Sequence, residues 1–194
     1  MPNKSPKPLR FVLGPGHQFR RESKPEKGTE IVEFAVCLPM VALLLIGIMD
    51  FGHAFNLKQQ LNNAAREGAR FASNQNTSDL TQNTPSSITA VRDVIANYLS
   101  NAHLKTCGLA TAAPSKAGLT WTYTANSNCP GTLTLTIERG LTTVQNGVTL
   151  TLTRVTLQYP FGWRFNRIVQ LVAPGASYAS PLIISSNAVM QNLP

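Results

Sequence analysis

The sequence predicts an α+β protein in which a long N-terminal helix, first transmembrane and then a stalk, packs on a small antiparallel β-sheet domain. Residues 34–49 form an apolar run that contains no charged residue. Apolar and small residues then recur at helical spacing up to residue 72, and beyond residue 118 apolar residues alternate with threonine. This change of hydrophobic period, from that of a helix to that of a strand, predicts both parts of the fold.

Residues 1–28 are a basic leader in front of the predicted helix. The formal net charge of the chain is +8, and residues 1–27 account for +5 of it. A basic chain raises the question of nucleic-acid binding, but this charge lies outside the predicted domain and accompanies no nucleic-acid-binding motif. Because Lys and Arg resist translocation, we interpret the leader as the cytoplasmic flank of a membrane segment and expect no nucleic-acid partner.

Residues 31–49 have the length of a transmembrane helix. As a helix they span ~28 Å, which matches a hydrocarbon core of roughly 30 Å. Four Lys and Arg lie between positions 11 and 30, against two between positions 50 and 69, which favours a single span with a cytoplasmic N-terminus. The alternative is a secretory signal cleaved near Gly52-His53-Ala54, but the apolar run exceeds the about 7 to 15 residues of such signals.

The helix is predicted to continue as an amphipathic stalk, so that one helix covers residues 29–73. Its recurring apolar and small residues are Phe51, Ala54, Phe55, Leu61, Ala65, Gly68, Ala69 and Ala72. Spacings of three and four place such residues on one face of a helix. An ordinary helix that packs on its own domain would show the same pattern, and the two interpretations are compatible.

Residues 74–194 are predicted to form an exported α+β domain. A helix over 87–101, capped by Ser87, leads into an Ala- and Pro-rich connection that ends at Gly118. Strands are predicted near 119–125, 132–138, 148–159 and 182–190, with an apolar loop or short helix over 161–172. In the strand 148–159 the apolar phase changes at Arg154, which predicts a bulge or bend in that strand.

The three cysteines differ in their sequence surroundings. Cys37 lies in the apolar run, where a lone thiol behaves as a small hydrophobe. Cys107 and Cys129 lie in the predicted domain, and export to an oxidising compartment would favour a disulfide between them, worth about 3 kcal/mol. In a reduced cytosol they would instead be two free, buried thiols.

No arrangement of residues in the sequence indicates catalysis. The histidines His17, His53 and His103 lie in the leader, at the membrane edge and in a loop, away from cysteines and carboxylates at metal-ligand spacing. The sequence contains no phosphate-binding glycine loop and no hydrolase nucleophile motif. We therefore expect neither an enzyme nor a cofactor or metal site.

The start of the predicted helix carries a recognisable series of motifs. Gly28-Thr29-Glu30-Ile31-Val32-Glu33-Phe34 is followed by Leu38-Pro39, by Gly47-Ile48-Met49-Asp50-Phe51-Gly52 and by Asn63-Ala64-Ala65-Arg66-Glu67-Gly68-Ala69-Arg70. The first motif resembles a type IV-like prepilin signal. Over about residues 27–73 the chain resembles the TadE-like family, the minor pseudopilins of the tight-adherence (Tad or Flp) pilus machinery.

The resemblance implies a pilin-like architecture and a role in pilus assembly. A prepilin peptidase would cut after Gly28, leaving Thr29 as the first residue. Glu33 would then pair with the new amino group of a neighbouring subunit, because an ionised carboxylate in a bilayer is costly unless it is paired. The implied location is the bacterial inner membrane, with a periplasmic C-terminal domain and with pilin or pseudopilin subunits and the assembly machinery as partners.

A second hypothesis stays open beside this one. Gly28 would be a helix-entry glycine, and Glu33 a carboxylate that reaches the membrane interface. The chain would then be an uncleaved, single-span membrane protein whose exported β-rich domain binds a secretion or surface partner.

Overall fold

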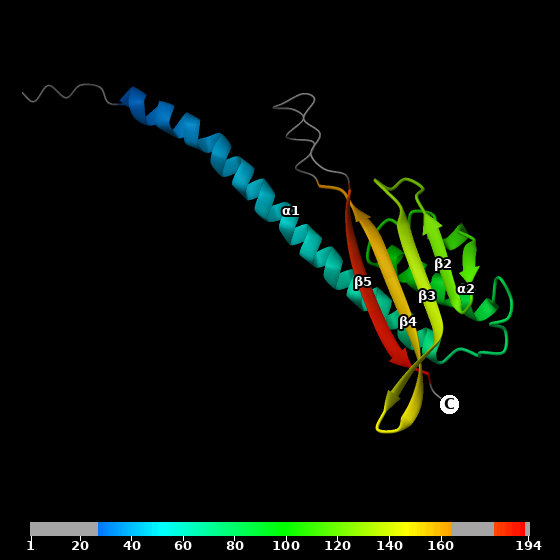
Figure 1. The fold of residues 1–194 in the computed structure, drawn as a ribbon. Coiled ribbons are helices and arrows are strands. Elements are labelled where there is room, and N and C mark those ends of the chain that lie inside the picture. Colours follow the sequence, from blue (N-terminus) through cyan, green and yellow to red (C-terminus); the bar gives the residue numbers. More distant parts are fainter. Residues whose placement is uncertain (1–26, 164–180, 193–194) are drawn as a thin grey trace, which may run out of the picture. The chain divides into compact units, whose positions relative to one another are not determined.

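The computed structural model describes residues 27–163 and 181–192, which form two helices, a short 3₁₀ helix and five strands (Figure 1). The chain divides into two compact units, residues 1–41 and 42–194. The elements in chain order are α1 Lys27–Ser73, α2 Ser86–Asn101, η1 Leu109–Thr111, β1 Pro114–Ala117, β2 Thr120–Ala125, β3 Leu133–Gln145, β4 Val148–Phe161 and β5 Leu182–Gln191. The predicted α+β class, a long helix on an antiparallel sheet, is confirmed.

Helix α1 has 47 residues and contains Pro39 without ending there. It begins at Lys27, two residues before the predicted start, and ends at the predicted Ser73. Most of the predicted leader, residues 1–26, lies outside the described residues, as does most of the apolar stretch predicted over 161–172. At 1.5 Å per residue the helix is about 70 Å long.

The sheet has the order β1-β2-β3-β4-β5, and every neighbouring pair is antiparallel. Its inward face carries the large buried side chains of β2, β3 and β4. These are Trp121, Tyr123, Leu133, Leu135, Ile137, Val155, Leu157 and Tyr159. Helices α1 and α2 lie on this one face (Figure 1), so the outward face keeps the threonines that alternate with these residues. Such one-sided burial is usual for an antiparallel sheet.

The second part of α1 packs along the sheet through a narrow apolar stripe. Leu61 is fully buried, as are the small residues Ala64, Ala65, Ala69 and Ala72. A side-chain carbon added at Gly68 would lie 2.7 Å from Ile95 Cδ1 of α2 and 3.6 Å from Val155 Cγ1 of β4. The small residues therefore let α1 approach both α2 and the sheet closely.

The predicted bulge in the strand 148–159 is wrong in its position. The register shift lies in β3, between Glu138 and Leu141, whereas β4 pairs with β5 without interruption. Gly140 has φ 73°, which glycine adopts without strain. In β4 the odd-numbered residues from Thr153 to Tyr159 face inward, so the phase does not change at Arg154.

The apolar even-numbered residues of β4 caused this error. Leu150 lies where the β3–β4 hairpin extends past both neighbouring strands, and Leu152 is the last residue of β4 that pairs with β5. Strand β2 pairs with β3 only up to Glu138. The residues of this extension are exposed or half-buried on both faces. Without a core to cover them, the side on which their apolar residues lie is not restricted.

A short strand that the sequence pattern did not predict, β1, pairs with β2 inside the Ala- and Pro-rich connection. Lys116 of β1 donates three hydrogen bonds, to the carbonyl oxygens of Leu80, Thr81 and Gln82 at 2.8–2.9 Å. These bonds tie the loop between the two helices to the edge of the sheet. Tertiary contacts of one lysine thus stabilise a strand whose own sequence has low strand propensity.

Candidate membrane-anchoring and processing site

Gly28 and Thr29, the predicted cleavage site, lie in the first turn of α1 and are exposed. A side-chain carbon added at Gly28 would meet no atom within 4 Å. The bond between the two residues is therefore sterically open on the helix surface. Its position in a helix end matters chemically, because the first turn lacks half of its backbone hydrogen bonds and opens most easily.

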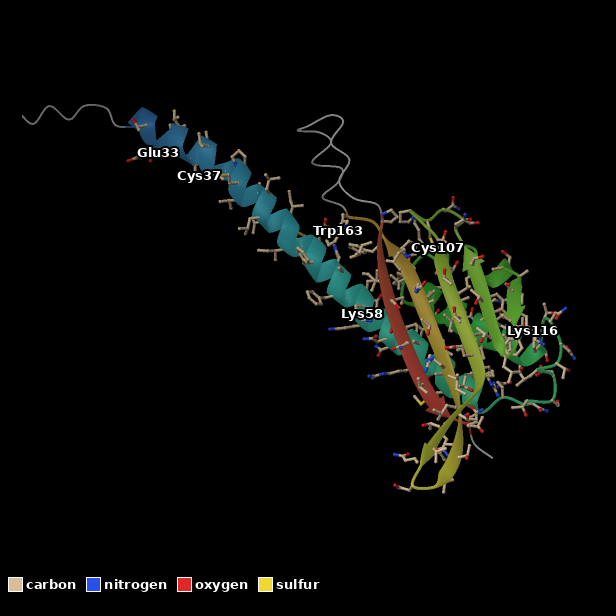
Figure 2. All side chains as sticks on the ribbon, viewed as in Figure 1. Glu33, Cys37, Lys58, Cys107, Lys116 and Trp163 are labelled. Carbon is tan, nitrogen blue, oxygen red and sulfur yellow. A yellow bond between two sulfur atoms is a disulfide. The ribbon has the colours of Figure 1, made fainter. Side chains whose placement is uncertain are left out.

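Glu33 lies one turn after Thr29, and Figure 2 shows it near the start of α1. Its side chain is exposed, and its neighbours Val32 and Phe34 are exposed as well, at 62% and 66%. Glu30, the second acid of this region, is also exposed. The helix thus presents two carboxylates at the edge of a surface that is otherwise apolar.

The apolar surface of α1 continues from these carboxylates to Phe55. Its large exposed residues are Ile31, Val32, Phe34, Val36, Leu38, Met40, Val41, Leu43, Leu44, Leu45, Ile48, Met49, Phe51 and Phe55. One 18-residue window has a mean hydropathy of 2.6, and none of that window is buried. The helix is therefore long and apolar enough to cross a membrane.

Asp50 ends the uncharged run of residues 34–49, and its side chain is buried, with 3% exposure. Sequence reasoning treated it only as part of a motif. The available signal was a carboxylate next to an apolar run, because an acid at such a position is a reason to look for a functional site. The buried state itself depends on the tertiary fold and could not be read from the run.

In the β-domain, Cys107 and Cys129 form a disulfide with a Cα–Cα distance of 5.5 Å. The loop around it is tied further by the Ser127 amide, which donates to the Cys107 carbonyl at 2.8 Å, and by Lys105 Nζ, which donates to the Asn128 carbonyl at 3.0 Å. Burial raises the pKa of Tyr159, and its hydrogen bond with the Lys105 backbone lowers it in part. Cys37 is a free, exposed cysteine of α1.

Arg139, in the bulge of β3, connects the sheet to the C-terminus of α1. Its side chain is 2% exposed and donates to the carbonyl oxygens of Ala72 and, at 3.1 Å, Gln75. A cation at the C-terminus of a helix is favoured by the helix dipole. Burial lowers the pKa of Arg139, and the nearby charge of Asp79 raises it in part. The only sign of this role in the sequence was the pair Arg139-Gly140, which interrupts the alternation of apolar residues and threonines in β3.

Asp79 caps α2, which corrects the prediction that Ser87 is the cap. The N-cap position is Pro85 and makes no side-chain bond. Instead the Asp79 carboxylate accepts from the Ser87 amide at 2.9 Å, the Ser87 hydroxyl at 2.8 Å and the Ser86 hydroxyl at 3.2 Å. Burial alone would raise the pKa of Asp79, but these hydrogen bonds together lower it. The cap comes from outside the helix, beyond the reach of a local capping motif.

Within residues 27–163 and 181–192, no group of three or more His, Cys, Asp or Glu side chains is placed to hold a metal ion. A polar hollow is lined by Gln75, Asn76, Ser78, Asp79, Ser86, Ser87 and Ala90. Its carboxylate already accepts the bonds that cap α2.

Comparison with known proteins gives a match that lies in the helix that carries Gly28 and Glu33. The model of a family described as TadE-like protein matches residues 28–70. No curated protein and no solved structure matches the chain. The matched residues contain Thr29, Glu33, the apolar surface of α1 and its packed stripe up to Arg70. Through residues 28–70 the chain is therefore similar to the TadE-like family, and the resemblance inferred from its sequence is confirmed.

Proposed function

We propose that this chain is a minor pseudopilin that takes part in the assembly of a tight-adherence pilus after a prepilin peptidase has cut it behind Gly28. The family match indicates involvement in a Tad pilus system, and that family is not known for enzymatic activity. One observation carries the finer proposal. A glycine with open space around it precedes, by five residues, an exposed carboxylate at the edge of an unpacked apolar helix surface.

Cleavage after Gly28 is supported by its surroundings. A peptidase must approach the scissile bond closely, and glycine presents no side chain to obstruct that approach. The bond lies next to the apolar surface, where a membrane-embedded peptidase would meet it. Opening one helical turn exposes the bond at low cost, because the end of a helix is its least stable turn.

Glu33 then acts in assembly. In a bilayer an ionised carboxylate favours a partner, and cleavage creates one, the amino group of Thr29. Thr29 of one subunit and Glu33 of its neighbour would pair and fix the register between adjacent apolar helices. The proposed topology is a cytoplasmic leader, a single span in the bacterial inner membrane and a periplasmic β-domain in which the Cys107–Cys129 disulfide persists.

The cleavage step is tested by intact mass and N-terminal sequencing of the protein from cells with an active prepilin peptidase. We expect Thr29 as the first residue. In Gly28→Val we expect the leader to remain, an increase of about 3 kDa, the share of 28 residues in a chain of 194 residues and 21.0 kDa. Gly47→Val is the matched control, since Gly47 lies in the same helix and also has no atom within 4 Å of an added side-chain carbon. A Met1 start in the wild type rejects cleavage and favours the uncleaved single-span protein.

The assembly step is tested with Glu33→Gln, which removes the charge and keeps the size of the side chain. We expect normal cleavage and a loss of about tenfold or more in the assembled fraction, because separating a buried charge pair costs about 3–5 kcal/mol. Glu30→Gln is the control, as Glu30 is equally exposed one turn earlier. Equal losses of assembly in the two variants would contradict a specific pairing of Glu33 with Thr29 of a neighbouring subunit.

A further inference from the structure

Three aromatic side chains meet where β4 ends beside α1. The ring centroids of Phe51 and Trp163 are 5.4 Å apart at an interplanar angle of 69°, and those of Phe161 and Trp163 are 5.2 Å apart at 85°. Figure 2 shows the Trp163 side chain near α1. Edge-to-face contacts of this kind hold aromatic rings in a fixed arrangement.

This aromatic cluster is open to the outside, and other apolar side chains lie beside it. Phe51 is 59% exposed, and both Phe161 and Trp163 are half-buried. Across the strand pair, Leu182 lies opposite Phe161 and Ile183 lies opposite Pro160, and both aliphatic residues are more than 40% exposed. An exposed apolar group of this extent at the end of a sheet indicates a contact with something apolar.

The cluster lies just beyond the end of the uncharged run of α1, residues 34–49. Phe51 follows Met49, the last residue of the uncharged run, by two residues, or ~3 Å along the helix axis. In a membrane-spanning helix this level corresponds to the boundary between acyl chains and headgroups. Tryptophan collects at that boundary because its ring is largely apolar while its N–H needs a polar partner.

We propose that the end of the β-domain formed by Phe51, Phe161, Trp163, Leu182 and Ile183 is a lipid-docking surface that rests in the headgroup–acyl boundary of the membrane. The inference rests on the proposed membrane anchor and adds a second contact with the same bilayer. This second contact would restrict the tilt of the β-domain relative to the membrane.

A bilayer fits this surface better than a second copy of the chain does. The apolar residues lie on α1, at the end of β4 and at the start of β5, whereas the outward face of β2, β3 and β4 carries alternating threonines. A flat dimer contact would require a broad apolar face with complementary shape. A small apolar group beside the apolar surface of α1 can enter the same bilayer as the helix.

The test uses the two tryptophans of the chain in vesicles of phosphatidylcholine. Trp121→Phe leaves Trp163 as the only emitter, and Trp163→Phe leaves Trp121, which is fully buried in the domain. Lipids brominated near the headgroup should reduce the Trp163 emission about twofold, and lipids brominated near the chain ends should reduce it less. The Trp121 emission should remain unchanged in both. If Trp121→Phe does not fold, the difference between wild type and Trp163→Phe gives the same quantity.

Flotation of the vesicles separates the two proposals. Protein that floats with vesicles while its Trp163 emission is not quenched overturns the docking surface and leaves the anchor intact. Protein that does not float overturns both. A Trp163 emission that ignores the bromines but depends on the ratio of protein to lipid identifies a second copy as the occupant, and that also overturns lipid docking.

Discussion

The two parts of α1 differ in what surrounds their apolar residues. Up to Phe55 the large side chains are exposed around the helix, whereas from Leu57 onward the apolar side chains form one stripe buried against α2 and the sheet. The composition differs accordingly, with Leu, Ile, Val and Met in the first part and Ala and Gly in the second. A helix apolar on all sides requires an apolar medium, and one with a narrow stripe requires a partner surface.

The contacts of α1 with the rest of the domain follow the chain in order, and they begin at Phe51, before the end of the exposed part. Phe51 meets Trp163, Lys58 donates to the carbonyl of Ser185, and Asn62 contacts Ser186. Farther along, Gly68 approaches Val155, and the last turn accepts the hydrogen bond of Arg139. The contacts of Lys58 and Arg139 thus hold both ends of the packed part. The free energy of unfolding of the domain should therefore respond more to changes in the packed part than to changes at the exposed residues of the apolar part.

The largest expected effect is that of truncating the same residue type in each part. Leu61→Ala should lower the free energy of unfolding of the domain by about 3 kcal/mol, because Leu61 is fully buried and leaves a cavity. Leu44→Ala, at a residue that is 62% exposed, should leave it unchanged. Urea unfolding of the detergent-solubilised chain, followed by the emission of buried Trp121 in a Trp163→Phe background, measures both. Equal losses would contradict the division of α1.

Arg139→Met should lower the same free energy by about 2 kcal/mol, since it removes two hydrogen bonds to carbonyls at the C-terminus of α1. Arg154→Met is the control one strand away. Arg154 forms a partly exposed ion pair with Glu138 at 3.2 Å, which is worth at most about 1 kcal/mol. An Arg139 variant as stable as the Arg154 variant would show that the helix end needs no buried cation.

Glycine-to-alanine changes compare the two parts at a smaller scale. Gly68→Ala should destabilise the domain by about 1 kcal/mol, because overpacking against fully buried Ile95 exceeds the gain in helix propensity. Gly52→Ala meets no atom within 4 Å and should be neutral or slightly stabilising. Thermal unfolding measures the pair. A stabilised Gly68→Ala would mean that α1 and α2 separate readily.

The smallest effect concerns the cap of α2 and depends on pH. Because the folded-state pKa of Asp79 is lowered, its ionised form stabilises the fold above the ordinary Asp pKa of about 4. This stabilisation is lost as the pH falls through the lowered pKa. Asp79→Asn should therefore cost under about 1 kcal/mol at pH 7, and the difference from wild type should vanish in acid. Asp93→Asn serves as control, because it removes a carboxylate of α2 that pairs with Arg92 and takes no part in the cap. A difference between Asp79→Asn and wild type that is constant at all pH values would reject the linkage.

Local sequence patterns were sufficient to predict the family resemblance over residues 28–70 and the fold class. Glu33 and Gly28 could be singled out because their spacing is read within one helix. The strand at residues 114–117 and the cap of α2 could not be predicted in this way. Lys116 bonds to Leu80, which is distant in sequence, and Asp79 caps α2 from outside the helix. The bulge was predicted in the wrong strand. The alternation of apolar residues indicates which face of a strand is buried only where a hydrophobic core covers that face.

The sequence alone determined the apolar helix, its change to a narrow stripe, the alternating strands and the pair of cysteines. Each of these is a short-range pattern of residue types, and the backbone period converts such a pattern directly into a face. Only the tertiary structure decided that Arg139 holds the end of α1, that Asp50 is buried and that Trp163 meets Phe51. These contacts depend on which distant residues come together once the helix lies on the sheet. A periodic pattern of residue types along the chain does not contain that information.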